Sequence, residues 1–227
     1  MESRVRVPDP RVERDRGAAR ALAGWAVEDR VPAELALAYD FANTHDERAF
    51  GGYEPFDALT HPADLARWLV HRGLVGRGVT ASTEDLALAH ALRRHLRAAA
   101  QAHHDPQAHH DPQTMRGFDA VAARLPLVVT LDATGGLGVL PAGGVTPVAT
   151  ALAHILAGTV TAEGRGTWAR LKMCLAPDCR WVFYDHCKPR TGRWCSTTGC
   201  GNRMKTKAYR ARTHAQPVDP HRAVSPR

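Results

Sequence analysis

All five cysteines of the chain lie between Cys174 and Cys200. Four of them form two pairs of equal spacing, Cys174-x4-Cys179 and Cys195-x4-Cys200, with fifteen residues between the pairs. Thiolates are soft ligands, and Zn²⁺ accepts four of them in a closed tetrahedral site that leaves no position for a substrate. In a reducing compartment such clusters bind metal more often than they form disulfides. The spacing therefore predicts one structural zinc ion per chain, held by Cys174, Cys179, Cys195 and Cys200.

Two other side chains of this segment could bind or react with a metal. Cys187 lies alone between the pairs, and we interpret it as a spare thiol outside the metal site. The alternative is a redox sensor, in which a thiolate reacts with a ligand cysteine and releases the ion. His186 could replace one cysteine as a ligand, but we favour an exposed or hairpin-lining histidine.

The positive charge of the chain is concentrated around these cysteines. The net charge of +7 is the sum of three parts. Residues 1–164 have a net charge of −4, residues 165–214 a net charge of +10 and residues 215–227 a net charge of +1. A run of charge can be no more than a solvated face. A field of this size also attracts polyanions, and we expect the basic segment to contact nucleic acid.

The residues after Cys200 predict a basic helix. The stretch GNRMKTKAYRAR contains no helix breaker after its first residue, and Arg203, Lys207 and Arg210 recur at i, i+4 and i+7. The predicted nucleic-acid contacts are Arg203, Lys205, Lys207, Arg210 and Arg212. Arg203 could instead brace the metal site, because it lies close to Cys200, and Asn202 could cap the helix.

The residues between the cysteine pairs must position the metal ligands. RWVFYD (180–185) alternates like a strand, residues 188–192 supply a turn, and residues 193–194 lead into the second pair, which together predict a metal-stapled hairpin. The aromatic residues of this segment are Trp181, Phe183, Tyr184 and Trp194. They could stack on bases, but we favour a small core around the metal. So short a module buries little area, so metal binding should supply most of its folding free energy, on the order of 10 kcal/mol.

Upstream of this module, helix signals surround one hairpin signal. LALAYDFANT (35–44) is either a buried strand or a short helix. Helices are predicted from Thr60 to Gly73, Ser82 to Gln101, Met115 to Leu125 and Thr146 to Gly158, and a hairpin over 126–144. The sequence therefore predicts an α+β fold: a mostly helical N-terminal domain with a β-hairpin, then a small zinc-stabilised hairpin-helix module.

Several polar clusters of the N-terminal region have a structural and a functional interpretation. Residues 1–30 are interpreted as a flexible extension. The repeated unit AHHDPQ supplies His103, His104, His109 and His110, and we interpret residues 102–113 as a linker loop rather than a metal site. Asp40, Asn43 and Thr44 either line a small-molecule pocket or cap the chain, and we favour the second interpretation.

Composition limits the remaining classes of function. A chain of 227 residues with 44% hydrophobic content can bury a sizeable core. There is no long apolar run and no secretory signal, so we expect a cytoplasmic protein that does not contact a membrane. Because G-x-S-x-G, H-E-x-x-H and a phosphate-binding glycine loop are all absent, we expect no enzyme.

Short motifs resemble two known domains. Residues 200–203 read Cys-Gly-Asn-Arg, and with Trp194-Cys195 and the Pro-Asp-Cys run at 177–179 they resemble the CGNR zinc finger. Upstream, LALAYDFANT, the helix start at 64–69 and LRRHLRA resemble the ABATE domain, which accompanies this finger in stress-induced transcription regulators of bacteria. A small polar residue is usual in the finger where Cys187 stands, so the resemblance also leaves Cys187 outside the metal site.

The resemblance implies a bacterial DNA-binding transcription regulator. Residues 31–164 would form an ABATE-like domain that senses a signal or mediates association, residues 165–214 a finger whose basic helix contacts duplex DNA, and residues 215–227 a disordered tail. One finger contacts few base pairs, so a homodimer is expected. The signal could be a small molecule or a redox change. The alternatives are an RNA-binding zinc protein and a protein-interaction module that zinc only shapes.

Overall fold

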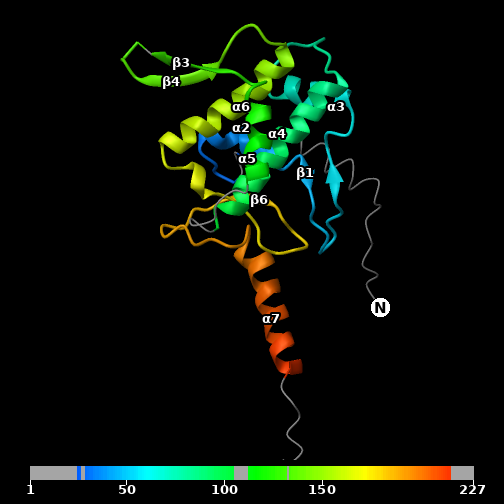
Figure 1. The fold of residues 1–227 in the computed structure, drawn as a ribbon. Helices are drawn as coiled ribbons and strands as arrows, with labels where there is room; N and C mark the ends of the chain where they lie inside the picture. Colours follow the sequence, from blue (N-terminus) through cyan, green and yellow to red (C-terminus); the bar gives the residue numbers. More distant parts are fainter. Residues whose placement is uncertain (1–24, 27–28, 105–111, 132, 216–227) are drawn as a thin grey trace, which may run out of the picture.

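The structure is a computed structural model that describes residues 25–26, 29–104, 112–131 and 133–215. Along the chain its elements are α2 (Ala33–Ala42), β1 (His45–Asp46), β2 (Phe56–Asp57), α3 (Pro62–His71), α4 (Thr83–Ala102), α5 (Pro112–Ala122), β3 (Leu127–Leu131), β4 (Leu137–Pro141), α6 (Pro147–Gly164), η1 (Trp168–Arg170), β5 (Leu171–Met173), β6 (Val182–Tyr184), η2 (Thr197–Gly201) and α7 (Asn202–Ala215). Figure 1 shows a helical body from which α7 projects. The predicted fold class, helices with small antiparallel hairpins and a C-terminal hairpin-helix, is confirmed.

Helices α2, α3, α4 and α6 surround a first apolar core. Its fully buried large side chains include Phe41, Leu65, Trp68, Leu92, Leu152 and Ile155. The predicted capping box of α4 is present, because the Ser82 hydroxyl accepts the Asp85 N–H at 3.0 Å and the Asp85 carboxylate accepts the Ser82 N–H at 2.9 Å. LALAYDFANT is a helix as far as Ala42, which decides between the two predicted conformations.

Three predicted helices have different ends in the structure. Helix α5 runs from Pro112 to Ala122 rather than from Met115 to Leu125, so it begins inside the predicted linker. Helix α3 is capped by His61 rather than Thr60, whose hydroxyl donates to Asp64 instead. Helix α6 continues past Gly158 to Gly164, so the predicted end is wrong. A Cβ at Gly158 would lie 2.4 Å from the Glu34 carbonyl oxygen. This glycine therefore permits the close approach of α2 to α6 and does not end the helix.

The predicted hairpin over 126–144 is confirmed. Strands β3 and β4 pair antiparallel with Val129 opposite Val139, and both strands extend beyond the helical body (Figure 1). Several of its apolar side chains are exposed to solvent, including Val129 at 71% and Leu137 at 78%. The hairpin thus carries an uncovered apolar surface.

A second apolar core joins the two regions that the sequence analysis separated. It contains Trp25, Leu35 and Tyr39 from the N-terminal region together with Leu171 and Val182 from β5 and β6. The ring centroids of Trp25 and Trp181 lie 5.0 Å apart in an edge-to-face arrangement. The finger segment therefore completes its core with side chains of the N-terminal region.

Residues 25 and 26 are part of this core, although they were predicted to belong to a flexible extension. Trp25 and Ala26 are buried, and their N–H groups donate to the Asp40 carboxylate at 2.7 and 2.9 Å. Asp40 therefore fixes the entry of the chain into the body. Residues 1–24 of the predicted extension lie outside the described residues, as do residues 216–227 of the predicted tail, whereas Ala215, the first residue of that tail, ends α7.

The histidines at the end of α4 also contact the finger segment. His103 and His104 were predicted to start a linker, but their ring nitrogens hydrogen-bond the carbonyl oxygens of Leu171 at 2.7 Å and Met173 at 2.5 Å. These contacts hold the edge of β5 against α4. Residues 105–111, with the other histidine pair, lie outside the described part of the chain.

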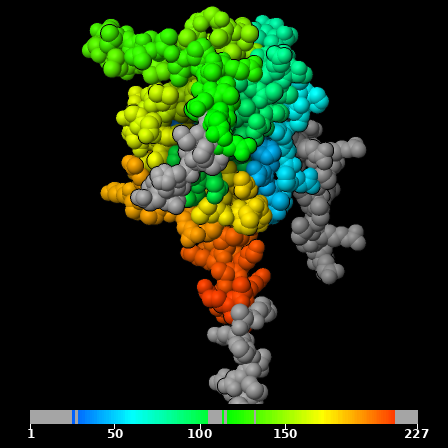
Figure 2. Space-filling view, in the orientation of Figure 1, coloured from blue at the N-terminus to red at the C-terminus, as the bar shows by residue number. Residues whose placement is uncertain are grey.

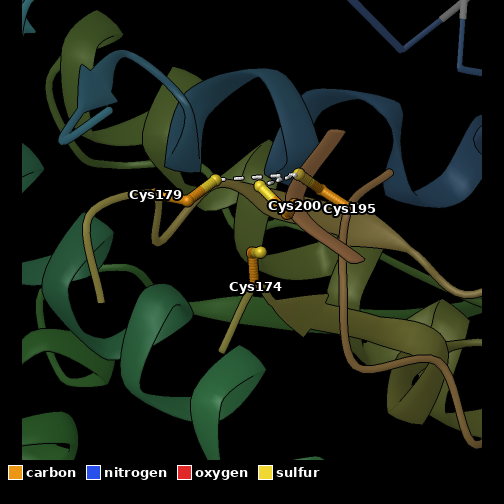
Figure 3. A group of neighbouring side chains, drawn as sticks. All are labelled: Cys174, Cys179, Cys195 and Cys200. Atoms are coloured by element: carbon orange, nitrogen blue, oxygen red, sulfur yellow. Dashed lines mark hydrogen bonds between the residues drawn. The ribbon is translucent and has the colours of Figure 1, made fainter. Parts of the chain in front are cut away.

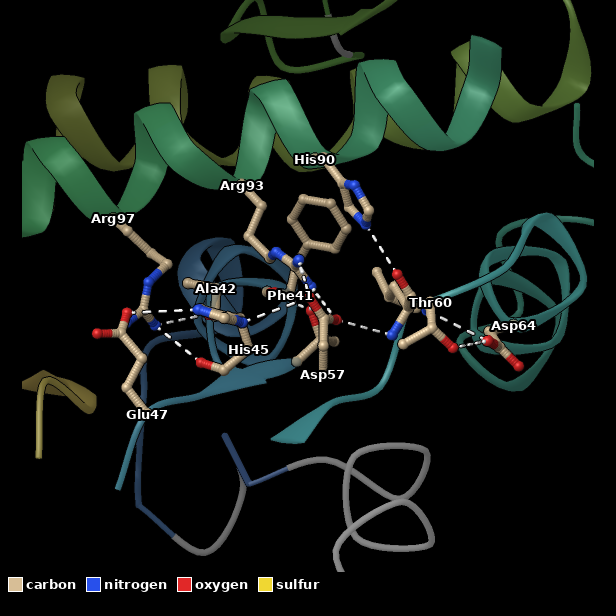
Figure 4. Close-up of polar contacts among 12 residues, drawn as sticks. Phe41, Ala42, His45, Glu47, Asp57, Thr60, Asp64, His90, Arg93 and Arg97 are labelled. Carbon is tan, nitrogen blue, oxygen red and sulfur yellow. Dashed lines mark hydrogen bonds and ion pairs between the residues drawn. The ribbon is translucent and has the colours of Figure 1, made fainter. Parts of the chain in front are cut away.

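Two buried arginines of α4 organise the loops below it (Figure 4). Arg97 donates to the carbonyl oxygens of Ala42, His45 and Arg180 at 3.0–3.1 Å and to Glu47 at 2.6 Å. Arg93 donates to Thr44 and pairs with Asp57. Burial alone would raise the pKa of Asp57, but His45 and Arg93 hold it well below its usual range. Each of the two arginines is thus paired with a carboxylate, and Arg97 also donates to the finger segment at the Arg180 carbonyl oxygen.

Candidate metal centre

The four paired cysteines converge on one point, as Figure 3 shows. Their sulfur atoms all lie within 4.8 Å of one another. The Cys179–Cys195 and Cys195–Cys200 Sγ distances are 3.6 and 3.7 Å. A tetrahedral zinc ion with Zn–S bonds of about 2.3 Å places its sulfurs about 3.8 Å apart. The four thiols therefore fit one structural zinc ion.

Each cysteine pair is held by its own turn. Cys174 directly follows strand β5, and its N–H donates to the Trp181 carbonyl oxygen at 2.8 Å. Cys179 lies in a turn that is closed by a hydrogen bond from its N–H to the Ala176 carbonyl oxygen. Cys195 lies two residues before the short π-helix η2, and Cys200 lies within it, one residue before its end. The predicted metal-stapled hairpin over 180–194 is therefore wrong in its pairing. Strand β6 pairs with β5, which precedes Cys174, and the first cysteine pair lies in the loop of that hairpin.

The protonation of the cluster follows from its crowding. Hydrogen bonds from Cys179 and Cys195 hold the pKa of Cys174 well below its usual range. The pKa values of Cys179 and Cys195 are raised, chiefly because these thiols donate to Cys174. Zn²⁺ requires four deprotonated ligands, so its binding displaces the remaining protons and is weakened as the pH falls.

Cys187 and His186 lie outside the four-thiol group. Cys187 is exposed, and the neighbouring Asp185 carboxylate raises the pKa of its thiol, which disfavours the reactive thiolate. The His186 Nε2 atom lies 3.0 Å from the Asp29 carbonyl oxygen, and its ring stacks edge-on against Tyr184. Both positions agree with the structural interpretations of these residues.

The two acidic residues of the basic segment are both engaged in ion pairs, a feature that the sequence analysis did not identify. Asp185 accepts from the buried Lys172 ammonium at 2.9 Å and from the N–H groups of Cys187 and Gly192. A Cβ at Gly192 would lie 2.6 Å from an Asp185 oxygen, so this turn requires glycine. Residues 165–214 contain only two acidic residues among twelve basic ones, and this rarity is the sequence signal that could have indicated a structural role for both.

Asp178 is the second of these acids, and it pairs with Arg203. Arg203 also places one guanidinium nitrogen 3.5 Å from the Cys200 sulfur, and its central carbon lies 3.7 Å from the centre of the Phe50 ring. A cation beside a ligand sulfur stabilises its thiolate. Arg203 therefore braces the metal site, as the alternative interpretation of this residue expected.

Asp40, Asn43 and Thr44, for which capping was favoured over a pocket, are buried and hydrogen-bonded within the chain. The Asn43 side chain donates to the Val182 carbonyl at 2.9 Å and accepts the Val182 N–H at 3.0 Å. Thr44 donates to Phe41 at 2.7 Å. Asn43 thus joins the end of α2 to β6, two segments 139 residues apart in sequence. Asn43 is the C-cap of α2, as the favoured interpretation expected, whereas Asp40 lies inside that helix and binds the N–H groups of Trp25 and Ala26.

Helix α7 carries the other predicted basic residues away from the body. Every side chain from Lys205 to Thr213 is exposed, and the helix contains no acidic residue. Figure 2 shows α7 standing clear of the domain surface in this view. The structure therefore groups Lys205, Lys207, Arg210 and Arg212 on a projecting helix, whereas Arg203 turns back toward the metal ligands.

The described helices do not include one that is both long and apolar enough to cross a membrane. No curated protein matches the chain significantly.

Two family models match the chain in consecutive segments. The CGNR zinc finger model matches residues 170–213, which include all four converging cysteines. The ABATE model, described as a putative stress-induced transcription regulator, matches residues 35–159, more than half of the chain. Both are families of regulatory or zinc-finger type rather than families of enzymes. The chain therefore belongs to the ABATE family and carries a CGNR zinc finger at its C-terminal end.

Proposed function

We propose that this protein is a DNA-binding transcription regulator whose helix α7 contacts duplex DNA. One observation carries the proposal: α7 projects from the zinc site with four exposed basic side chains and no acidic side chain. A helix that is polar all round and unsupported by the body gains little stability from its own chain. An external polyanion would supply a partner for these charges, which form no ion pair within the described part of the chain.

The spacing of the basic residues suits a helix lying in the major groove. With 3.6 residues per turn, Lys205 and Arg212 fall on one side of α7, and Lys207 and Arg210 on the other. At 1.5 Å per residue the helix is about 21 Å long, and the major groove, about 12 Å wide, admits it. Cations on opposite sides of such a helix reach the phosphates that border the groove.

An uncharged polar stripe lies between the two basic sides. Its members, at i, i+4, i+7 and i+11, are Asn202, Thr206, Tyr209 and Thr213. All four are exposed. Asparagine and threonine side chains are common readers of base edges. We therefore assign sequence reading to this stripe and phosphate contact to the basic residues beside it.

The proposal also includes a homodimer, an input signal and a cytoplasmic location. A single finger contacts few base pairs, so two copies give useful specificity. The exposed β3–β4 hairpin supports association, because none of its ten strand residues is charged and several apolar side chains are uncovered. Binding without catalysis is the activity proposed.

The test is a salt series on the zinc-loaded protein with duplex DNA. Log affinity should fall with log salt at a slope of about −0.9 for each phosphate contacted. Removing one contact by Lys207→Ala or Arg210→Ala should make the slope shallower by about 0.9 and weaken binding at low salt. Lys188→Ala is the matched control, since it removes one exposed charge from the finger outside α7.

Each outcome of this test decides between functions. An unchanged slope and affinity in both α7 variants, with zinc retained, would mean that α7 is only solvated and would favour a protein-interaction module. Tighter binding to single-stranded RNA than to duplex DNA would favour the RNA-binding alternative.

A further inference from the structure

A cleft of about 750 Å³ opens between the N-terminal region and the zinc finger. Its walls come from Trp25 and Tyr39, from the loop at 46–56, from β6 and from the turn that holds Cys195 and Cys200. Ligand pockets of small molecules have volumes of about 300–1,000 Å³. Eight of the fourteen aromatic residues of the chain line this one cleft. Seven of the eight also belong to the second apolar core or pack against it, and Tyr53 is the one that does not, so the cleft opens along the aromatic edge of that core.

The cleft already holds one cation of the protein between aromatic faces. The guanidinium carbon of Arg48 lies 4.0 Å from the ring centre of Tyr53 and 3.9 Å from that of Trp181. Both oxygens of the buried Asp46 carboxylate accept from the same guanidinium at 2.6–3.0 Å. Two rings and one carboxylate of the cleft thus already bind a planar positive charge, and the same kind of contact would bind a planar cationic ligand.

Apart from the Asp46–Arg48 pair, the Asp, Glu, Lys and Arg residues among the described lining residues are acidic. Asp46 and Arg48 neutralise each other, which leaves the carboxylates of Asp29 and Glu54. Arg48 is the one Lys or Arg among the described lining residues. The lining is therefore acidic and aromatic, in contrast to the basic finger beside it. Acidic aromatic clefts favour organic cations over neutral or anionic molecules.

We propose that this cleft binds a small aromatic organic cation. The rings of the ligand stack against the aromatic walls, with Tyr53 the most accessible at 48% exposed, and Asp29 and Glu54 balance its charge. The bound molecule also contacts the turn from which α7 begins, because Ser196, Gly199 and Cys200 form part of the wall. The binding site goes beyond the proposed DNA contact and does not depend on it.

The test is calorimetric titration of the full zinc-loaded chain with three probes of similar size. These are 1-methylquinolinium, which is cationic, quinoline, which is neutral at pH 7.5, and 2-naphthoate, which is anionic. The cation should bind about tenfold more tightly than quinoline, and 2-naphthoate most weakly of the three. Equal binding of the three probes, or binding of none at millimolar concentration, would overturn the proposal.

Variants with matched controls locate the binding. Tyr53→Leu and Glu54→Gln change exposed side chains of the cleft, so the fold should tolerate them. Each should weaken 1-methylquinolinium binding about fivefold, and Glu54→Gln should leave quinoline binding unchanged. Tyr209→Leu and Glu163→Gln make the same changes at exposed positions outside the cleft and should have no effect. If the cleft variants bind the cation as the parent does, the site is not this cleft.

Discussion

Residues 171–200 and helix α7 belong to the same zinc finger, but they differ in what surrounds them. In the first segment Leu171, Met173 and Val182 are fully buried against Trp25 and Tyr39 of the N-terminal region. In α7 the last side chain that packs on this core is Met204, and every described side chain beyond it is exposed. One part of the finger is thus an interior element, and the other is a projecting surface.

The difference shows how a small metal module divides its tasks. Its acidic residues, Asp178 and Asp185, both lie in the first segment, where Asp185 pairs with Lys172 and Asp178 pairs with Arg203 in the first turn of α7. Because α7 contains no acidic residue, its charges from Lys205 onward are not neutralised by residues of that helix. Stability therefore depends on the first segment, and contact with a polyanion depends on α7.

Zinc removal should have the largest effect on this arrangement. A structural zinc ion contributes on the order of 10 kcal/mol to folding. Because the second core is shared, chelation should abolish amide protection in residues 171–200 and also in the parts of the N-terminal region that face them, including Tyr39. The first core around Trp68 and Leu152 should stay protected. Amide hydrogen exchange resolved by segment measures both.

Two outcomes would contradict this expectation. If protection is lost only in residues 171–215, the finger folds on its own and the shared core adds little. Uniform protection before and after chelation would show that the metal is not structural.

Removal of the Asn43 amide should have an intermediate effect. Asn43→Ala leaves the N–H and C=O of Val182 buried without their partner, and each such group costs about 1–3 kcal/mol. We expect the free energy of unfolding to fall by about 3 kcal/mol in urea titrations, with faster loss of zinc to a chelator. Asn202→Ala is the matched control, because Asn202 is exposed at the start of α7 and should change stability by about 0.5 kcal/mol or less. If both variants lose the same amount of unfolding free energy, the finger segment at 171–200 is no more dependent on the N-terminal region for its stability than α7 is.

Substitution of the exposed basic residues of α7 from Lys205 onward should have the smallest effect on stability. Lys207→Ala changes an exposed side chain, so the free energy of unfolding should stay within about 0.5 kcal/mol of the parent. Arg203→Ala, by contrast, removes the partner of Asp178 and should accelerate zinc release. A loss of more than about 1 kcal/mol in Lys207→Ala would show that α7 packs on the body.

Local signals in the sequence predicted much of this structure. Both the capping box of Ser82 and Asp85 and the spacing within each cysteine pair involve residues a few positions apart. Such features can therefore be recognised in the sequence alone. The role of Gly158 was misread, because a helix stop and a close helix contact favour the same residue.

Long-range contacts could not be predicted from such patterns. Nothing local in the sequence shows that Trp25 packs on Trp181, or that Asn43 pairs with the backbone of Val182. The pairing of β6 with β5 was missed for a related reason: β5 is three residues long and its burial comes from α4 and the second core. Tertiary packing, rather than strand propensity, decides such short strands.

The shared core also constrains how the chain folds as it is synthesised. Translation delivers Trp25, Leu35 and Tyr39 long before the residues of β5 and β6 that cover them. Until the C-terminal quarter has been made, the nascent chain carries an uncovered apolar face next to an already assembled helical core. Ribosomal stalling or truncation near residue 170 would therefore leave a partly folded and aggregation-prone product, not a stable domain that lacks only its finger.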